Sequence, residues 1–219
     1  MQGGNVLPCA VVGTCFSKAT GSEKMKISKR MKNSYPAMMD SSFRCLVENG
    51  LEHSSVRDFC KAAHLSSSSF YYRFTGKQEL VLEATYYGLR SITNELFLVA
   101  VKNLDSINRL FDCFFDTTDR LKKDIKLIYQ VANSPVYGDE LKRMAESLNQ
   151  FYHEITELIA QKLNCSPETL FPYVTLFISA IREYVIWEDR TITQGNLQLL
   201  YDGAMQLPKK DAGVLTDKV

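Results

Sequence analysis

The sequence has no uninterrupted apolar run long enough to span a bilayer. Its most apolar stretch, residues 171–187, is broken by Ser179, Arg182 and Glu183, whereas a membrane-spanning helix needs about 18 or more apolar residues in succession. The mildly apolar segment 6–16 has no basic region before it, and a basic polar run follows it, unlike a secretory leader. We therefore expect a cytoplasmic protein without a membrane partner.

Paired cysteines and catalytic patterns are also missing. The six cysteines, at positions 9, 15, 45, 60, 113 and 165, have no C-x-x-C spacing, which favours reduced thiols over disulfides or a metal site. His153-Glu154 followed by Glu157 does not make H-E-x-x-H, and no nucleophile elbow, phosphate-binding loop or dinucleotide fingerprint occurs. These absences predict that the protein is not an enzyme and that it binds no metal ion or cofactor.

The chain has little net charge, but the charge is unevenly distributed. The sum over 219 residues is +1, yet residues 1–35 carry six basic side chains and a single acidic one. A basic terminus is typical of an arm that binds phosphates, and equally of a merely solvated tail. Both interpretations stay open, and the lack of helical periodicity predicts that residues 1–33 are a disordered arm.

Helical periodicity is what the sequence does contain. Gly and Pro fall almost entirely between segments of helical spacing, and no sustained alternation indicates a sheet. The predicted class is all-α, with a three-helix helix-turn-helix domain joined by a long helix to a C-terminal helical domain, about nine helices in all. The expected divisions are an arm over 1–33, a DNA-binding domain over 34–83 with its helix-turn-helix near 55–74, a body over 84–208 and a flexible tail over 209–219.

Capping residues predict where the first helices begin. Ser34 is the expected N-cap of a helix from Tyr35 to Asn49, with Pro36 in its first turn and Gly50 after its end. Capping boxes at Ser55-x-x-Asp58 and Thr75-x-x-Gln78 predict the starts of the second and fourth helices, and Ser66 caps the third, which ends near Phe74. The fourth helix is expected to reach about Lys102. The body should add helices over 104–121, 124–133, 136–164, 167–189 and 193–207.

The step His64-Leu65 joins the second and third helices in a tight turn, which is the layout of a helix-turn-helix. Such hairpins also occur in proteins that never contact DNA. The residues of 54–84, SSVRDFCKAAHLSSSSFYYRFTGKQELVLEA, are more specific, because they closely resemble the DNA-binding domain of the TetR family. The matching positions are Gly50, Ser55, Phe59, Cys60, Ala63, Leu65, Ser66, Phe70, Tyr71, Phe74, Lys77 and Leu80.

The resemblance implies a bacterial, homodimeric transcriptional regulator that binds operator DNA and senses a small molecule. His64 departs from the family's usual Gly at a turn position that commonly needs positive φ, which His tolerates better than most residues. The resemblance assigns phosphate contacts to Tyr71 and Lys77, and base reading then falls to side chains of the third helix. The predicted DNA-binding residues are Ser55, Ser66, Ser67, Ser68, Ser69, Tyr71, Tyr72, Arg73 and Lys77.

The body is expected to hold the ligand and the dimer interface. Aromatic side chains are dense there, and although such stripes are often plain core, the resemblance implies a pocket for a small, largely apolar effector. The predicted pocket residues are Phe111, Phe114, Phe115, Tyr129, Tyr152, His153, Phe177, Tyr184 and Trp187. The last two helices should pair with those of a second copy, through Leu170, Val174, Phe177, Ile181, Val185, Leu197, Leu200, Tyr201 and Ala204.

These features favour a sequence-specific DNA-binding regulator, most simply a repressor that its ligand releases from the operator. The alternative is a helical protein that binds a ligand or another protein and carries a vestigial helix-turn-helix. A salt-sensitive, sequence-preferring gel shift separates the two hypotheses, because only the regulator produces one.

Overall fold

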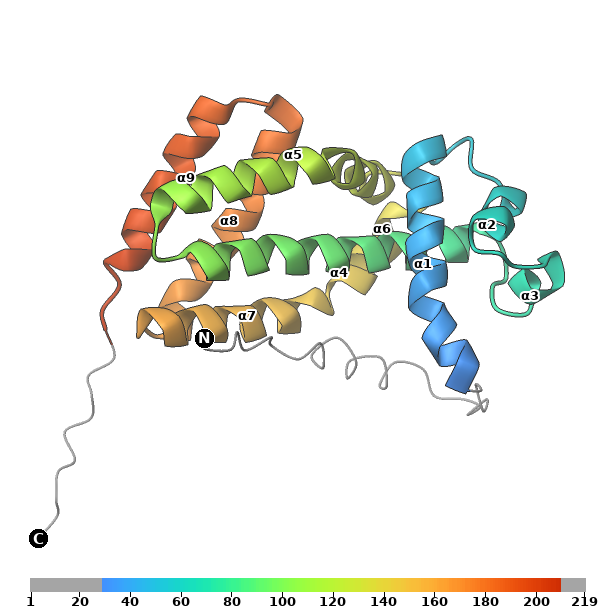
Figure 1. Ribbon diagram of the computed structural model, residues 1–219, viewed down its shortest axis with the longest axis horizontal. Helices are drawn as coiled ribbons and strands as arrows, with labels where there is room; N and C mark the ends of the chain where they lie inside the picture. Colours follow the sequence, from blue (N-terminus) through green and yellow to red (C-terminus); the bar gives the residue numbers. More distant parts are fainter. Residues whose placement is uncertain (1–28, 210–219) are drawn as a thin grey trace, which may run out of the picture. The chain divides into compact units, whose positions relative to one another are not determined.

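The computed structural model describes the backbone of residues 29–209 and the side chains of residues 35–209. This part contains nine helices and no strand, which confirms the all-α class (Figure 1). The helices are α1 (Lys29–Asn49), α2 (Val56–Ala62), α3 (Ser67–Tyr71), α4 (Lys77–Asn103), α5 (Ile107–Ala132), α6 (Gly138–Ala145), α7 (Leu148–Leu163), α8 (Pro167–Trp187) and α9 (Arg190–Met205). Residues 35–209 form one compact unit. The first 28 residues of the predicted arm, and the predicted tail after residue 209, lie outside the described residues.

Helix α1 begins earlier than the capping pattern predicts. Ser34 is a position within the helix and not its N-cap, and Pro36 lies inside the helix, seven residues after its start at Lys29. The residues before Ser34 include Lys, Arg and Met, all strong helix formers. Their propensity outweighs the usual preference of proline for the first turn. The predicted end is correct, since Gly50 follows the helix with a φ of +82°.

The body's helices differ from the prediction in their divisions. Residues 107–132 form the single helix α5 where two helices were expected, and the single helix expected over 136–164 is divided into α6 and α7. The break after Ala145 contains neither Gly nor Pro. It is held by the Ser147 hydroxyl, which hydrogen-bonds the Met144 carbonyl and the Tyr86 hydroxyl of α4. The break therefore depends on a contact with another helix.

One hydrophobic core connects the helix-turn-helix with the body. It runs from Met39 of α1 and Phe59 of α2 through Leu80 of α4 to Ile128 of α5. The predicted boundary between residues 83 and 84 falls inside α4 and inside this core, so the division into two domains stays a prediction. Gly88 of α4 is essential to the packing, because a Cβ there would lie 2.5 Å from ring atoms of Phe43.

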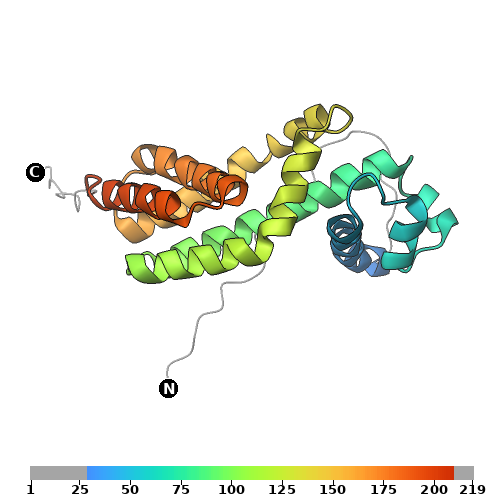
Figure 2. The same cartoon turned by 90° about the horizontal axis from the view of Figure 1, so that it is seen from above.

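Helix α4 packs against α5, α6 and α7, while α8 packs against α5, α7 and α9. The last two helices, orange and red in Figure 2, lie side by side as a hairpin. The ring of Tyr173 on α8 would lie 2.6 Å from a Cβ at Gly203 of α9, so the missing side chain permits their close approach. A second apolar cluster, which includes Phe97, Ile159 and Leu170, joins α4, α7 and α8.

Helix α8 departs from the expectation that no segment is long and apolar enough to cross a membrane. Its 21 residues include a stretch with a mean hydropathy of 1.2, of which a third is buried within the protein. Length and composition alone meet the requirement, and the core helix of a water-soluble protein can meet it too. Arg182 and Glu183, which interrupt the apolar run in the sequence, are both exposed.

Candidate DNA-binding surface and interior cavity

Helix α2 begins with the predicted capping box. The Asp58 backbone N–H donates to the Ser55 hydroxyl over 3.3 Å, and the Ser55 N–H donates to the Asp58 carboxylate over 2.9 Å. The Ser55 hydroxyl also donates to this carboxylate, over 2.6 Å. The two hydrogen bonds that the carboxylate accepts, from the Ser55 hydroxyl and the Ser55 N–H, lower the pKa of Asp58 because they favour its charged form. The box fixes the direction in which the chain enters α2.

The turn between α2 and α3 is built around His64, whose φ is +53° as expected for the usual glycine position. The Leu65 N–H donates to the Cys60 carbonyl over 2.8 Å and thereby closes the end of α2. Helix α3 then begins at the predicted N-cap, Ser66, whose hydroxyl accepts from the Ser69 N–H over 3.1 Å. The predicted helix-turn-helix is therefore present in its local geometry.

Helix α3 has one apolar face and one exposed face. Phe70 and Phe74 are buried, with ring centroids 5.4 Å apart, and they fix the helix against the rest of the domain. Tyr71 and Tyr72 are 61% and 63% exposed. Large side chains that project into solvent from such a helix are available to contact DNA.

The four serines of the first turn form a hydroxyl cluster on the exposed surface. The Ser66 hydroxyl lies 3.0 Å from that of Ser68 and 2.8 Å from that of Ser69. Ser67 is exposed on the same turn, and Ser55 is exposed at the start of α2. The hydroxyls can donate to phosphates or base edges, but they discriminate weakly among bases.

The two predicted basic contacts are held by other parts of the domain. The Lys77 ammonium donates to the Leu51 carbonyl over 3.0 Å, and the Arg73 guanidinium lies 3.7 Å from the Met38 sulfur of α1. Lys77 retains two further donors for a phosphate. Arg73 is directed towards α1, which argues against its predicted role in reading bases.

The predicted Thr75-Gln78 capping box does not form. The backbone N–H and the hydroxyl of Thr75 both donate to the Glu79 carboxylate instead, over 2.6 and 2.8 Å, and Gly76 is the N-cap of α4. Glu79, one residue after Gln78, accepts both hydrogen bonds. A carboxylate makes a stronger hydrogen bond than the neutral amide of Gln78.

Two basic residues of α2 were not predicted as contacts. Arg57 and Lys61 are four residues apart, and both are exposed. Residues with this spacing lie on the same side of a helix, so the two charges can face one stretch of DNA backbone. The i, i+4 spacing of basic residues beside the helix-turn-helix was the signal available in the sequence.

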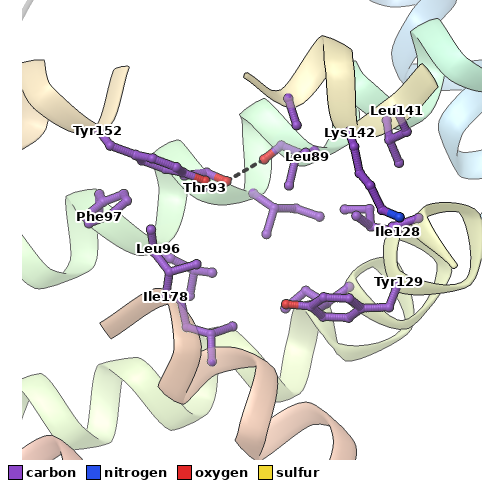
Figure 3. A pocket seen from close by; sticks show the side chains of 15 residues that line it. Leu89, Thr93, Leu96, Phe97, Ile128, Tyr129, Leu141, Lys142, Tyr152 and Ile178 are labelled. Atoms are coloured by element: carbon purple, nitrogen blue, oxygen red, sulfur yellow. Dashed lines mark hydrogen bonds between the residues drawn. The ribbon is translucent and has the colours of Figure 1, made fainter. Parts of the chain in front are cut away.

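A cavity of about 220 Å³ lies in the body, between helices α4 to α8 (Figure 3). Its walls are mostly aliphatic, with Tyr129, Tyr152, Thr93 and Lys142 as the polar contributors. Burial raises the pKa of both tyrosines, so each remains a protonated hydrogen-bond donor at neutral pH. The Lys142 side chain is 67% exposed and lies at the rim.

Comparison with known proteins gives a match over the helix-turn-helix. The sequence profile of bacterial regulatory proteins of the tetR family matches residues 38–84. The N-terminal domain belongs to the TetR family. This segment is the DNA-binding part of a transcriptional regulator, as the sequence predicted. A search of curated protein sequences finds no match.

Solved structures of similar helical arrangement include three bacterial proteins of low identity. A structure described as a transcriptional regulator from Pseudomonas aeruginosa PAO1 is 14% identical, with a TM-score of 0.46, over 80% of this chain and 90% of that one. A tetR family regulator from Shewanella sp. PV-4 is 12% identical, with a TM-score of 0.46, over 77% and 96%. The TetR family regulator PfmR from Thermus thermophilus is 13% identical, with a TM-score of 0.39, over 84% and 99%. The family assignment rests on residues 38–84 alone.

Only two of the predicted pocket residues line the large cavity. They are Tyr129 and Tyr152, whereas Phe177 lines a second, smaller cavity. His153 is exposed and stacks on Phe171 with ring centroids 4.3 Å apart, and Trp187 is 72% exposed. Neither side chain contributes to the cavity.

The remaining predicted pocket residues form an aromatic core cluster, composed of Phe111, Phe114, Phe115 and Tyr184, all buried. The rings of Phe115 and Tyr184 meet edge to face with centroids 4.9 Å apart. The Tyr184 hydroxyl donates to the Asp119 carboxylate over 2.8 Å. Burial and this hydrogen bond raise the pKa of Tyr184 to about 12. These aromatics pack the protein, and aliphatic residues supply most of the cavity wall.

The predicted interface residues of α8 and α9 face the interior of the chain. Those that are buried are Leu170, Val174, Ile181, Val185 and Leu197, and those that are half-buried are Phe177, Leu200, Tyr201 and Ala204. The same two helices expose a different apolar set, composed of Leu176, Ile186, Trp187, Ile192 and Leu199. The sequence shows the apolar excess of these helices, but not which of their faces the body covers.

The described residues include no group of His, Cys, Asp and Glu side chains arranged to hold a metal ion. Cys45, Cys60, Cys113 and Cys165 are free thiols. Burial raises the pKa of the Cys45 and Cys60 thiols. Both are therefore less reactive than exposed cysteines.

Proposed function

We propose that this protein is a homodimeric regulator that binds operator DNA through α2 and α3 and is released by a small ligand bound in the body. It acts by binding and not by catalysis, in the cytoplasm. The observation that carries the proposal is the TetR-family match over residues 38–84, together with the exposed hydroxyls and tyrosines on α3. Repression is the simplest consequence, since a bound dimer obstructs transcription.

The DNA-binding part of the proposal is tested with the DNA upstream of the protein's own coding sequence. We expect fluorescence anisotropy to detect binding that prefers this DNA over a scrambled duplex and weakens steeply with added salt. The comparison variant is Tyr71→Ala/Tyr72→Ala, which removes two exposed rings without opening the core and should bind this DNA more weakly. Binding with neither sequence preference nor dependence on these rings would instead favour a vestigial helix-turn-helix.

The dimer is proposed to form through the exposed apolar residues of α8 and α9 defined above. Trp187 and Leu199 are each 72% exposed, and large apolar side chains gathered on adjacent helices are typical of an interface. A second copy that covers this set accounts for the apolar character of α8 without a membrane. Size-exclusion chromatography with light scattering should give twice the mass of the 24.9 kDa chain.

Ligand control is proposed to act through α4, which reaches both sites. One side of this helix lines the cavity, through Leu89, Ile92, Thr93, Leu96 and Phe97. The preceding turns pack on α1 at Gly88 and hold Leu51 through Lys77. A ligand that moves α4 therefore changes the support of the helix-turn-helix. A hundredfold preference of the ligand for the DNA-free state shifts the equilibrium by about 2.7 kcal/mol.

A further inference from the structure

A second cavity, of about 80 Å³, lies next to the large one and is lined by residues of α4, α5, α7, α8 and α9. Its lining is apolar apart from two tyrosines, and the Tyr201 hydroxyl already donates to the Leu104 carbonyl over 2.9 Å. Phe97 is the one residue that lines both cavities. Its side chain is 2% exposed, so it forms part of the wall between them.

Phe97 is held in this wall by aromatic neighbours from both sides. Its ring centroid lies 6.1 Å from that of Tyr152, which lines the large cavity, and 6.0 Å from that of Phe177, which lines the small one. Phe151 makes a third contact, at 6.5 Å. These edge and tilted contacts fix the ring in place.

One hydrogen-bond donor of the large cavity, the Tyr129 hydroxyl, lies away from Phe97. In Figure 3, Phe97 is on one side and the Tyr129 phenol points into the space from the opposite side. The Tyr129 hydroxyl has no hydrogen-bond partner among residues 35–209, whereas the Thr93 hydroxyl beside Tyr152 donates to the Leu89 carbonyl over 2.7 Å. A half-buried donor without a partner can be satisfied by an acceptor on a ligand.

The lining itself offers little to a charged ligand, and the Arg182 guanidinium that acts on Tyr129 is exposed outside it. Lys142 is its one ionisable group apart from the tyrosines, and it is mainly exposed, with the Asp139 carboxylate 3.8 Å from its ammonium. An ionised group placed in an aliphatic cavity without a buried partner pays a large desolvation penalty. An uncharged acceptor, such as a carbonyl or ether oxygen, does not.

On the basis of the proposed ligand function, we infer that the ligand is an uncharged, elongated aliphatic molecule with one terminal hydrogen-bond acceptor. Tyr129 donates to that acceptor, and Phe97 limits the length of the tail. Removal of the Phe97 ring joins the two cavities into one longer space. The residue thus determines specificity for chain length.

The test uses the full chain and straight-chain methyl ketones from hexan-2-one to tetradecan-2-one, with affinities from isothermal titration calorimetry. Each added methylene buried in the cavity should tighten binding about fourfold until the tail meets Phe97. In Phe97→Ala the rise should continue for about two or more further carbons. The second cavity adds about 80 Å³, compared with roughly 30 Å³ for a group the size of water.

Matched variants separate the length limit from loss of stability. Phe111→Ala removes a buried ring that lines neither cavity, so it should leave the length limit unchanged. Phe97→Leu retains more of the packing and should move the limit less than Phe97→Ala, which keeps the test available if the alanine variant does not fold. Tyr129→Phe should weaken all ketones about fivefold without moving the limit.

The outcomes are distinct. A longer limit in both Phe97 variants, with no change in Phe111→Ala, supports the inference. The same limit in the parent and in both Phe97 variants overturns the role of Phe97 while leaving the cavity as a ligand site. Tighter binding of the matching carboxylates than of the ketones overturns the uncharged class. If no ketone or carboxylate binds, both the inference and the proposed ligand site fail, and DNA binding is unaffected.

Discussion

The Arg44 guanidinium of α1 donates to the Asp124 carboxylate of α5 over 2.6 Å. The Asp124 side chain is only 6% exposed, whereas that of Arg44 is 47% exposed. The next residue of α5, Ile125, lines the large cavity. This ion pair therefore joins the helix-turn-helix directly to a wall of the proposed ligand site.

The unequal burial of the pair predicts unequal costs when one partner is removed. Arg44→Met leaves a buried carboxylate without a partner and should lower the free energy of unfolding by about 2–3 kcal/mol. Asp124→Asn leaves a half-exposed guanidinium that water can solvate, and should cost about 1 kcal/mol. Urea unfolding of the two variants measures the difference. Equal costs would show that the ion pair with Arg44 does little to compensate the burial of the Asp124 carboxylate.

The salt dependence of DNA binding is predicted to distinguish charged phosphate contacts from neutral ones. Lys61→Ala and Lys77→Ala should each reduce the slope of log affinity against log salt by about 0.9, because each ammonium releases counterions from DNA. Tyr71→Phe removes a neutral donor and should weaken binding about fivefold with the slope unchanged. Anisotropy titrations over a range of salt concentrations provide the slopes.

Lys123→Ala is the matched control for these titrations, since Lys123 is exposed on α5, outside the helix-turn-helix. A thermal melt of Lys77→Ala is also needed, because Lys77 holds the Leu51 carbonyl. An unchanged slope in both lysine variants would remove them from the DNA-binding surface.

Association is predicted to depend on the exposed apolar residues of α8 and α9. Leu199→Asp should raise the dimer dissociation constant about a hundredfold or more, since burying an unpaired carboxylate costs about 3 kcal/mol. Leu158→Asp is the control, because Leu158 is 53% exposed on α7, away from this set. Sedimentation equilibrium distinguishes them, and equal dissociation constants would place the interface elsewhere.

Local signals in the sequence predicted local structure well. The Ser55 and Ser66 caps and the positive φ of His64 depend on residues within a few positions of one another. Asp124 shows the limit of this reasoning, because it falls where the sequence pattern indicated a helix break. Helix α5 continues through it, and its partner Arg44 lies 80 residues away in the sequence, so the local pattern contains no sign of the pairing.

The residues of the candidate site were likewise predicted from the sequence only where local spacing decides their position. The exposed tyrosines of α3 followed from helical spacing around Phe70. The cavity wall did not, because the aliphatic residues that line most of it have the same sequence pattern as ordinary core residues. Which face of α8 is covered depends on how the other helices pack, and the periodicity of α8 alone does not contain that information.

The ion pairs of Glu188 are predicted to make the stability of the protein sensitive to acid. Lys122 and Lys126 form ion pairs with its carboxylate at 2.8 and 2.9 Å, and their hydrogen bonds lower its pKa from 4.5 to about 2. Because the folded-state pKa is the lower one, the stabilisation is complete above about pH 4.5 and is lost as pH falls towards 2. Glu188→Gln should therefore be less stable than the parent at neutral pH, with the gap closing over this range. Circular dichroism melts at several pH values measure it, and added salt should narrow it.

The turn at His64 offers a stabilising substitution. A φ of +53° is unfavourable for a residue with a Cβ, and glycine relieves about 1 kcal/mol or slightly more. Part of this gain is offset by the greater freedom of glycine in the unfolded chain. We expect His64→Gly to raise the free energy of unfolding by about 0.5 kcal/mol, and His64→Val to lower it, in the same urea assay.

The exposed position of Trp187 makes the chain its own spectroscopic probe. It is the single tryptophan in the sequence and is 72% exposed at the end of α8. Its indole emission therefore reports from one known place, among the apolar side chains assigned to association. Emission from a water-exposed indole lies at longer wavelength than that from a buried one. A dilution series read by the wavelength of maximum emission should thus follow the monomer–dimer equilibrium without any attached dye.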